Sequence, residues 1–481
     1  MIRPPIVTIL GHVDHGKTTL LDYVRKSRIA AKEHGGITQK IGAYEIKTGI
    51  KGYKNDRITF IDTPGHETFS KLRARGASVA DIALLVIDAK DSLMPQTVES
   101  ISHIQAAKIP FIVVLNKIDL PDINPDKVKN DLLKYQVMVE GKGGTTPVAN
   151  ISAKTGQGVD ELLEMILLIT EGLNQTYDKK APVAGYIIET KKGKQGLSVS
   201  MIVKNGCLKL GDVIYADSHK AKIRSMINDL GQSVNEVCPS TPVEIFGFET
   251  TPEVGSLISS QIKTKIITAP PATIPKTLDM DAVLNPVEKK KKLSLVIKTD
   301  SYGSLEAIDN SLIDNDNLEI ILKAVGDIHK SDVFLAKTTG SVIVGFNIKI
   351  DPEIKDLAKQ EKVIIKSYTI IYELLEELNE VADLLKEKEE KERNLKGEVK
   401  ILATFIIENE RVFGVKITKG KINLNDELEV YRNNNLFGKT KLVSLKVRAK
   451  RVNEVKKDQE AGMVLSPQLD IRVGDVVKSI L

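Results

Sequence analysis

The stretch Gly11–Thr18 reads GHVDHGKT and directly follows the apolar run PIVTIL. The spacing G-x-x-x-x-G-K-T of a phosphate-binding loop is met by Gly11, Gly16, Lys17 and Thr18. The glycines let the chain curl so that its amides face phosphate oxygens, and helix dipoles add to that field. Lys17 offers a cation to the β- and γ-phosphates, and Thr18 offers a hydroxyl to Mg²⁺. The stretch predicts a nucleotide site between a strand and a helix.

The same loop contains three potential metal ligands, His12, Asp14 and His15. In a phosphate-binding curl the amides face the ligand and the side chains face outward. We therefore expect these three side chains to splay apart, with Lys17 repelling a dication until phosphate arrives. The sequence favours a phosphate cradle, with Mg²⁺ brought by the nucleotide.

A guanine-binding pattern, NKID, spans Asn116–Asp119 and follows the apolar run PFIVVL. The Asp119 carboxylate can accept hydrogen bonds from N1–H and the exocyclic amine of guanine, whereas adenine has no matching donor pair. Lys117 can lie along the base, and Asn116 can tie this loop to the phosphate loop. The stretch SAKTG, Ser152–Gly156, adds an amide at Ala153 that can donate to guanine O6.

Two further segments predict a switch driven by the γ-phosphate. DTPGHE ends the apolar run RITFID, so Asp62 can hold Mg²⁺ through water and the Gly65 amide can sense the γ-phosphate. His66 then lies where a hydrolytic water is oriented. In EHGGITQ, Thr38 can reach Mg²⁺ and order its loop only when γ-phosphate is present.

The predicted site set gathers these loops. The residues expected around GTP are Gly11, His12, Val13, Asp14, His15, Gly16, Lys17, Thr18, Asp62, Thr63, Pro64, Gly65, His66, Asn116, Lys117, Ile118, Asp119, Ser152, Ala153 and Lys154. The residues expected at Mg²⁺ are Thr18, Thr38 and, through water, Asp62.

Hydrophobic patterning predicts a multidomain chain of α/β and β-barrel units. Apolar runs and helical patterns alternate in residues 1–174, which predicts a parallel sheet covered by helices. The remaining segments are a β-barrel at 175–267, a linker at 268–292, a small α/β domain at 293–370, a connecting helix at 371–396 and a second β-barrel at 397–481. If helical from Glu373 to Lys396, the connector would span about 36 Å.

Charge is distributed unevenly along the 481 residues. The net charge is +5, and residues 397–481 hold 16 Lys and Arg against 11 Asp and Glu, so the whole excess lies there. An anionic partner such as RNA is expected at that end, and a solubilising surface is the alternative. No apolar run is long enough to span a bilayer. Cys207 and Cys238 are the only cysteines, and we expect neither a disulfide framework nor a zinc set, which fits a reducing cytoplasm.

These motifs resemble those of translational GTPases, most closely bacterial-type translation initiation factor two. The resemblance rests on GHVDHGKT, GGITQKIGAY, DTPGHETF, LRARGA, DSLMPQT, NKID and SAKTG, and continues in NDLGQSVNEVCPSTPVEIFG and LSLVIKTDSYGSLEAI. It implies a monomeric cytoplasmic GTPase that places formyl-methionyl initiator tRNA on the small ribosomal subunit and promotes joining of the large one. It also implies His66 as the catalytic residue, with other initiation factors as further partners and no membrane partner.

Family resemblance implies that the last barrel grips the aminoacylated end of the tRNA, with the long helix as spacer. Val415 and Ala461 stand where the family commonly has cysteine. The basic stretch supplies the expected tRNA contacts Lys446, Arg448, Lys450 and Arg451. Because no aromatic residue lies inside it, phosphate contact is favoured over base stacking. Family members usually carry an N-terminal extension, and this chain starts close to the phosphate loop.

Three other functions fit parts of the pattern. An elongation-type tRNA carrier shares the nucleotide motifs, but the order of barrel, α/β unit, long helix and barrel argues against it. A tRNA-binding scaffold with a non-hydrolysing nucleotide switch would differ in turnover. A P-loop ATPase or small-molecule kinase is disfavoured by NKID.

Overall fold

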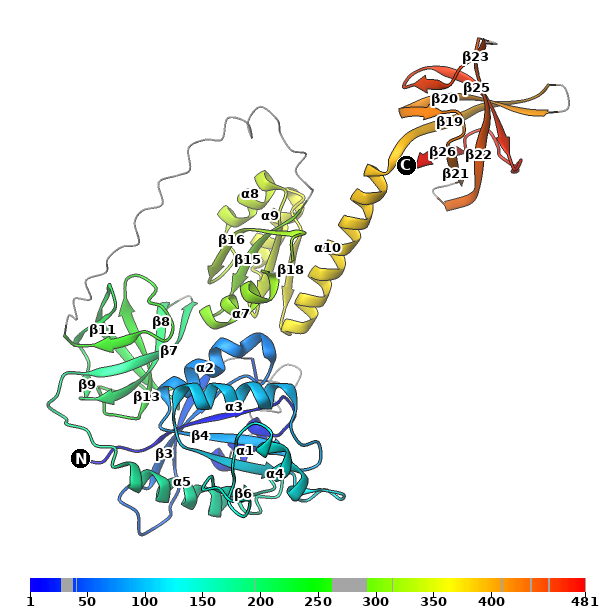
Figure 1. The fold of residues 1–481 in the computed structure, drawn as a ribbon. Coiled ribbons are helices and arrows are strands. Elements are labelled where there is room, and N and C mark those ends of the chain that lie inside the picture. Colours follow the sequence, from blue (N-terminus) through cyan, green and yellow to red (C-terminus); the bar gives the residue numbers. More distant parts are fainter. Residues whose placement is uncertain are drawn as a thin grey trace, which may run out of the picture. The chain divides into compact units, whose positions relative to one another are not determined.

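The computed structural model describes the chain except residues 27–37, 40, 194, 262–291, 314, 408–409, 433–434, 449 and 481. The chain divides into two compact units. The first contains the described parts of Met1–Leu284 and Leu293–Asn379, and the second contains those of Glu380–Leu481. The predicted fold class, α/β domains with β-barrels, is confirmed (Figure 1).

The N-terminal domain is built on a six-stranded sheet in the order β2-β3-β1-β4-β5-β6. Its strands are β1 (Ile6–Gly11), β2 (Gly42–Lys47), β3 (Arg57–Asp62), β4 (Ile82–Asp88), β5 (Phe111–Asn116) and β6 (Val148–Asn150). All pairs are parallel except β2 with β3, so an antiparallel edge strand adds to the parallel sheet that we expected. The carboxyl ends of β1, β3 and β5 carry the nucleotide motifs, as in other open α/β sheets.

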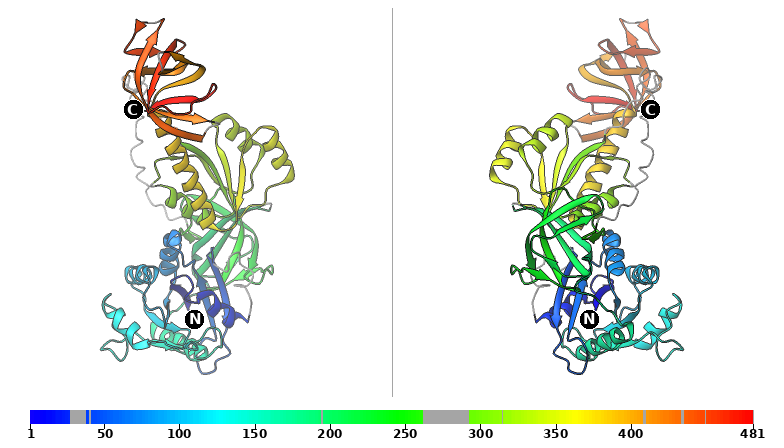
Figure 2. Two further views of the ribbon diagram at one scale, coloured as in Figure 1. Left: turned by 90° about the vertical axis from the view of Figure 1, so that its right-hand side faces the viewer. Right: turned by 90° about the vertical axis from the view of Figure 1, so that its left-hand side faces the viewer.

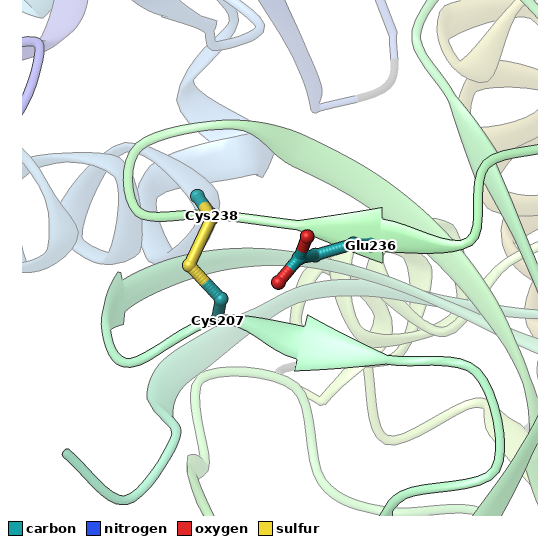
Figure 3. A group of neighbouring side chains, drawn as sticks. All are labelled: Cys207, Glu236 and Cys238. Atoms are coloured by element: carbon teal, nitrogen blue, oxygen red, sulfur yellow. A yellow bond between two sulfur atoms is a disulfide. The ribbon is translucent and has the colours of Figure 1, made fainter. Parts of the chain in front are cut away.

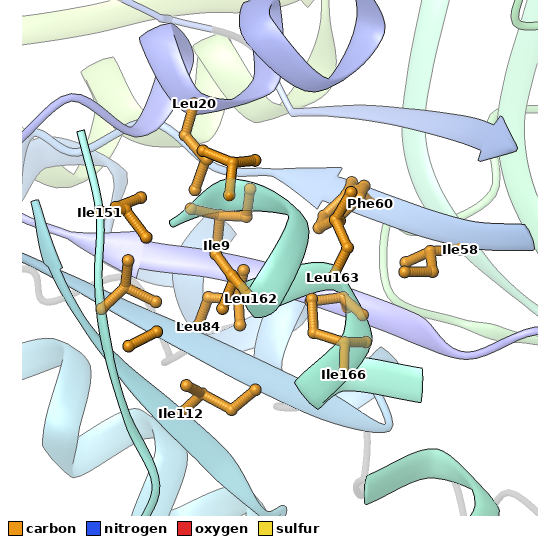
Figure 4. Close-up of a cluster of buried hydrophobic side chains, with 14 of the residues drawn as sticks. Ile9, Leu20, Ile58, Phe60, Leu84, Ile112, Ile151, Leu162, Leu163 and Ile166 are labelled. Atoms are coloured by element: carbon orange, nitrogen blue, oxygen red, sulfur yellow. The ribbon is translucent and has the colours of Figure 1, made fainter. Parts of the chain in front are cut away.

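Helices cover both faces of this sheet. They are α1 (Lys17–Arg25), α2 (Ser70–Val79), α3 (Pro95–Ala107), α4 (Pro125–Leu133) and α5 (Val159–Leu173). One face packs on α1 and α5 through a cluster that includes Ile9, Leu20, Leu84 and Ile166 (Figure 4). The other face packs on α2, α3 and α4. Since β1 and β4 are buried along their whole length, the phosphate loop starts from a rigid support.

A closed barrel follows, with strand order β10-β11-β13-β8-β7-β14. Its strands are β7 (Ala184–Gly193), β8 (Gly196–Asn205), β10 (Val213–Ala216), β11 (His219–Asn228), β13 (Pro242–Phe248) and β14 (Leu257–Ser259). Figure 2 shows these green strands from two opposite sides. Two short strands, β9 (Leu208–Lys209) and β12 (Glu236–Val237), pair with each other in a separate antiparallel ladder. In the sequence β9 follows β8, and β12 follows β11.

The two cysteines are joined to each other, whereas we expected no disulfide framework and a reducing environment. Cys207 and Cys238 form a disulfide, with 4.3 Å between their Cα atoms (Figure 3). The β9–β12 ladder pairs Leu208 with Val237, so the next residues outward, Cys207 and Cys238, are brought opposite each other. The pairing depends on a register between segments 31 residues apart, and sequence spacing alone did not reveal it.

The second α/β domain holds four parallel strands in the order β16-β15-β17-β18. They are β15 (Leu293–Thr299), β16 (Leu318–Val325), β17 (Val342–Phe346) and β18 (Ile365–Tyr368), with helices α7 (Tyr302–Leu312), α8 (Lys330–Thr339) and α9 (Pro352–Gln360). Helix α7 contacts both preceding domains. Glu306 pairs with Arg75 of α2 at 2.7 Å, and the Gly303 amide donates to Glu189 of β7 at 3.1 Å.

The predicted connecting helix is one continuous element, α10 (Ile371–Arg393), and it ends three residues before Lys396. Its first turns pack by Ile371, Leu374 and Leu378, which are buried. Among the described residues no helix is long and apolar enough to cross a membrane.

In its described residues the second unit holds the part of α10 from Glu380 onward and eight strands, six of which close into a barrel. The eight strands are β19 (Leu395–Ile407), β20 (Glu410–Asn423), β21 (Glu427–Arg432), β22 (Asn435–Val447), β23 (Lys450–Arg451), β24 (Glu454–Lys456), β25 (Glu460–Ser466) and β26 (Val476–Ile480). The path β19-β26-β21-β22-β25-β20 is closed by pairing of β19 with β20. Val415 and Ala461 are direct cross-strand partners in the buried core. These two departures from the family pattern therefore change core packing and leave the barrel surface alone.

Candidate functional site

The phosphate loop adopts a tight curl between β1 and α1. Gly11 and Gly16 both have positive φ, at 143° and 88°. A Cβ on Gly11 would meet the Val86 carbonyl at 2.3 Å, and one on Gly16 would meet Asn116 Nδ2 at 2.3 Å. Glycine is required at both positions by backbone conformation and by space.

Lys17 is buried at the floor of this loop, where its Nζ donates to the His12 carbonyl at 2.5 Å. Burial lowers the pKa of Lys17 to about 8, and the neighbouring Asp62 opposes that fall. Burial removes water from the ammonium and so destabilises its charge. A phosphate anion beside it would stabilise that charge again. Lys17 is thus suited to phosphate.

The side chains expected at Mg²⁺ lie together. The hydroxyls of Thr18 and Thr38 are 2.7 Å apart, although Thr38 is twenty residues further along the chain. Asp62 is buried at the end of β3. Hydroxyl and carboxylate oxygens are the hard donors that Mg²⁺ prefers, so these residues fit the ion.

Asn116 joins three of the predicted loops. Its Nδ2 donates to the His15 carbonyl at 2.8 Å, and its Oδ1 accepts from the Ala153 amide at 2.9 Å. The first contact is the tie that we expected between the NKID loop and the phosphate loop. The second contact ties the Ala153 amide to the same clamp, and donation from that amide to guanine O6 stays a prediction.

Asp119 and Lys117, the residues predicted to bind the base, each have a polar partner in the protein. The Ser152 hydroxyl donates to Asp119 Oδ1 at 2.6 Å, and this hydrogen bond lowers the pKa of Asp119. Lys117 Nζ pairs with Asp88 at 2.7 Å. Asp119 is therefore ionised at neutral pH, the state needed to accept two guanine N–H groups, and Ser152 fixes one of its oxygens.

His66 begins the short 3₁₀ helix η2 (Glu67–Phe69). Its Nδ1 accepts from the Thr68 amide at 3.1 Å, which assigns the proton of the neutral ring to Nε2. Burial lowers the pKa of His66, the nearby Glu67 charge opposes the fall, and the ring is neutral at pH 7. The Tyr372 ring stands edge-on to it, with 4.1 Å between centroids.

A cavity of about 220 Å³ brings together part of the predicted nucleotide site, but not Asp62, Asn116 or Asp119. It is lined by Val13, Asp14, Gly16, Lys17, Thr18, Thr19, Thr38, Gly65, His66 and Lys117. Residues from four separate loops thus face one space. A second cavity, of about 800 Å³, is also lined by His66, together with Tyr372 of α10 and Asn310 and Ser311 of α7. His66 lies between the two.

The histidines of the phosphate loop differ from our prediction. We expected His12 and His15 to splay apart, but their rings meet edge-on with 5.1 Å between centroids. His15 is buried, with Nδ1 3.4 Å from the Val86 carbonyl, and burial lowers its pKa to about 4. His15 is therefore a neutral packing residue beneath the loop.

Sequence reasoning missed Gln39 and Tyr372. The Gln39 side chain donates to the Thr369 carbonyl at 2.9 Å and accepts from the Ile371 amide at 3.1 Å, at the start of α10. Gln39, the residue after Thr38, therefore contacts the same turn of α10 that carries Tyr372, the residue in contact with His66. Gln39 and Tyr372 each lie more than 300 positions from the residue that they contact. The one signal in the sequence was the position of Gln39 beside Thr38.

The four cations predicted to contact tRNA lie on one hairpin of the second unit. Lys446 of β22 pairs with Arg451 of β23, and Val447 pairs with Lys450. Arg448 lies at the turn with φ of 48°. All four cations are exposed. Because successive pairs of a ladder alternate in direction, Lys446 and Arg451 share one face of the hairpin and Lys450 lies on the other.

This fold and site define a P-loop GTPase of the translational type. The model for the elongation factor Tu GTP-binding domain matches residues 3–171, that for elongation factor G domain 2 matches 182–261, and that for translation-initiation factor 2 matches 273–379. The chain is 40% identical over 497 residues to translation initiation factor IF-2 of Halothermothrix orenii, covering 99% of this chain and 72% of that relative.

Three other proteins are also similar to this chain. IF-2 of Thermotoga petrophila is 42% identical, with 98% of this chain and 70% of that relative covered, and IF-2 of Bartonella henselae is 40% identical, with 99% and 58% covered. The GDP-bound aIF5B structure from Aeropyrum pernix is 26% identical, with a TM-score of 0.46, and covers 100% of this chain and 92% of that one. The chain belongs to the translation initiation factor IF-2 family. It is a translation initiation GTPase that binds guanine nucleotide.

Proposed function

We propose that this factor uses GTP to place formyl-methionyl initiator tRNA on the small ribosomal subunit and to promote joining of the large one. Contact with the ribosome switches on hydrolysis, which releases the factor. The observation that carries the proposal is the 220 Å³ cavity, because it brings Lys17, Thr18 and Thr38 together with Gly65 and His66.

We assign the nucleotide contacts to the loops that line or border this cavity. The loop Gly11–Thr18 wraps the phosphates, with the Lys17 ammonium on the β- and γ-phosphates. Asp119 accepts from guanine while Lys117 lies along the base. Support for guanine specificity comes from the ionised Asp119 carboxylate, since adenine would leave it unpaired.

The proposed ligands of the Mg²⁺ that accompanies GTP are Thr18, Thr38 and, through water, Asp62. When bound, the ion neutralises charge on the β- and γ-phosphate oxygens. The 2.7 Å contact between Thr18 and Thr38 supports this assignment, because both hydroxyls already face one point. Thr38 can then report on the γ-phosphate and pass that state to Gln39 and the start of α10.

His66 is the proposed catalytic residue. A neutral ring with its proton on Nε2 presents that edge to the attacking water, while the Thr68 amide fixes the ring through Nδ1. The position of His66 between two cavities supports control by the ribosome. In this arrangement a partner that enters the larger cavity can move the ring toward the phosphate.

The C-terminal barrel is the proposed grip on the initiator tRNA. Its exposed hairpin cations, Lys446, Arg448, Lys450 and Arg451, suit phosphate contact. The buried Val415 and Ala461 leave that surface unaltered, which supports retention of tRNA binding.

The test compares His66→Ala with the parent protein in GTP binding and in GTP hydrolysis with ribosomes. We expect unchanged nucleotide affinity and a ribosome-stimulated rate reduced about 10²- to 10⁴-fold. His219→Ala is the matched control, since that histidine of β11 bonds Thr250 away from the nucleotide loops. A normal stimulated rate in His66→Ala would remove His66 from the mechanism.

A further inference from the structure

Arg73 of helix α2 is a charged side chain with no exposed surface. A buried guanidinium is retained only where several acceptors compensate the loss of water. Neither the nucleotide motifs nor the base-binding loops contain this residue. Its partners therefore indicate what the side chain does.

Most of those partners are backbone carbonyls of the loop that carries His66. Arg73 Nη1 donates to the Pro64 carbonyl at 3.0 Å and to the His66 carbonyl. Nη2 lies 3.5 Å from the Glu67 carbonyl. One planar guanidinium thus holds three of four consecutive residues, which a single ammonium could not do with the same geometry.

Holding these carbonyls also orients the amides beyond them. In a planar trans peptide the C=O of one residue and the N–H of the next point in opposite directions. A guanidinium on the Pro64 oxygen therefore turns the Gly65 N–H away from Arg73. Gly65 lines the phosphate cavity, and a Cβ there would meet Lys17 Nζ at 2.5 Å.

The guanidinium is itself anchored from a second helix. Glu99 of α3 accepts from Arg73 Nη2 at 2.6 Å through one oxygen, and its other oxygen lies 3.1 Å from His103 Nε2. Helix α3 packs on the sheet through Ile101 and Ile104, so this anchor is rigid. The chain of contacts runs from a fixed helix through Arg73 to the loop of Gly65 and His66.

We propose that Arg73 is a positioning residue for GTP hydrolysis, which holds the Pro64–Glu67 loop so that the Gly65 amide and the His66 ring face the γ-phosphate. The inference rests on the proposed catalytic role of His66. Beyond that role, we infer that Arg73 fixes the conformation of the Pro64–Glu67 loop, in addition to any ordering by the nucleotide.

The test uses Arg73→Met and Arg73→Lys, with Arg75→Met as the matched control. Arg75 lies two residues along the same helix and pairs with Glu306, so its replacement removes the same charge without touching the loop. For Arg73→Met we expect GTP affinity within about threefold of the parent and the ribosome-stimulated kcat reduced about 10²-fold, with the KM for ribosomes little changed. Arg73→Lys should restore only part of the rate.

Hydrogen exchange of the segment 62–69 gives a readout independent of turnover. Arg73→Met should speed exchange of the Gly65 and Glu67 amides, and Arg75→Met should not. Parent-like kcat and exchange in Arg73→Met would overturn the proposal, as would an equal loss in Arg75→Met. A parallel fall in GTP affinity would assign Arg73 to folding instead. If His66→Ala hydrolyses normally while the exchange contrast holds, the role of His66 fails and the loop anchor stands.

Should Arg73→Met fail to fold, Glu99→Gln provides the second variant. It keeps the side-chain shape and weakens the anchor that fixes the guanidinium. We expect Glu99→Gln to lower kcat and to speed exchange as Arg73→Met does, with a loss of kcat about tenfold smaller than in Arg73→Met. Unchanged values in Glu99→Gln together with unchanged values in Arg73→Lys would equally overturn the proposal.

Discussion

The ring of Tyr372 stands edge-on to the ring of His66, at 89° and with 4.1 Å between their centroids. The two residues lie 306 positions apart, on α10 and on the loop after β3. The contact joins the proposed catalytic residue to the first turn of the connecting helix. Gln39, which follows Thr38, accepts a hydrogen bond from the Ile371 amide in the same turn.

Replacing Tyr372 should release His66. An aromatic pair of this kind contributes about 0.5–1.5 kcal/mol, so we expect Tyr372→Ala to raise ribosome-independent GTP hydrolysis about two- to tenfold. Tyr372→Phe keeps the ring and should behave as the parent. Single-turnover hydrolysis without ribosomes measures the effect, and an unchanged rate in Tyr372→Ala would mean that the contact does not restrain His66.

Replacing Asp119 with Asn should change base preference from guanine toward xanthine. In our proposal the carboxylate accepts two N–H groups from guanine, whereas the amide can donate to the xanthine oxygen at that position. A loss of discrimination of order 10⁴ is expected, measured by competition between GTP and XTP. Asp122→Asn, three residues further along an exposed loop, is the control. Retained guanine preference in Asp119→Asn would show that this residue does not read the base.

GTP binding should take up protons at alkaline pH. The pKa of Lys17 is lowered to about 8 by burial, and phosphate should raise it again. Below about pH 8 the ammonium is already charged, so affinity is constant; above it, binding requires a proton and affinity falls up to tenfold per pH unit. Calorimetry at about pH 8.5 in two buffers with different ionisation heats measures this uptake. Equal apparent binding enthalpies in the two buffers would contradict the assignment.

Removing the hairpin charges should weaken tRNA binding and flatten its salt dependence. With about four phosphates neutralised, the log–log salt slope of the parent should be near −3. Changing Lys446, Arg448, Lys450 and Arg451 to Ala should bring that slope close to zero and leave GTP affinity unchanged. Lys416→Ala with Lys419→Ala, on exposed positions of β20, is the control. A steep slope in the fourfold variant would place the contact elsewhere on the barrel.

Gly303 should not tolerate a side chain. A Cβ there would meet Glu189 Oε2 at 2.7 Å and Leu72 Cδ2 at 3.1 Å, where α7 meets the barrel and α2. We expect Gly303→Ala to lower the free energy of unfolding by about 1–3 kcal/mol. Gly172→Ala in α5 meets no atom within 4 Å and should be neutral or stabilising by up to about 1 kcal/mol. Denaturant titration compares them, and equal effects would contradict the packing argument.

The nucleotide loops could be predicted because each is a short contiguous pattern next to a strand. Gly11–Thr18, Asp62–His66 and Asn116–Asp119 need only local spacing and the rule that parallel strands end at one edge. The contact between the Ala153 amide and the Asn116 side chain was not predicted, because the two residues lie on different loops. Gln39 and Arg73 lie in the quoted stretches GGITQKIGAY and LRARGA, but the sequence does not show that they contact distant or backbone groups, and Tyr372 lies in no quoted motif.

In the two barrels too, the sequence did not show which residues lie opposite each other. Alternating strands and turns predicted both, yet the pairing of Cys207 with Cys238 depends on which strands neighbour each other. For Val415 and Ala461, the sequence showed a change of residue type, and only the register showed that they face each other in the core.

The sulfur bridge in the first barrel has a consequence for proteolysis. It joins the two ends of a segment that contains β9, β10, β11 and β12. A single protease cut inside that segment would leave two fragments still covalently attached. They would migrate together on a gel without reductant and separate only after a thiol is added, so limited digestion could report the oxidation state of this domain.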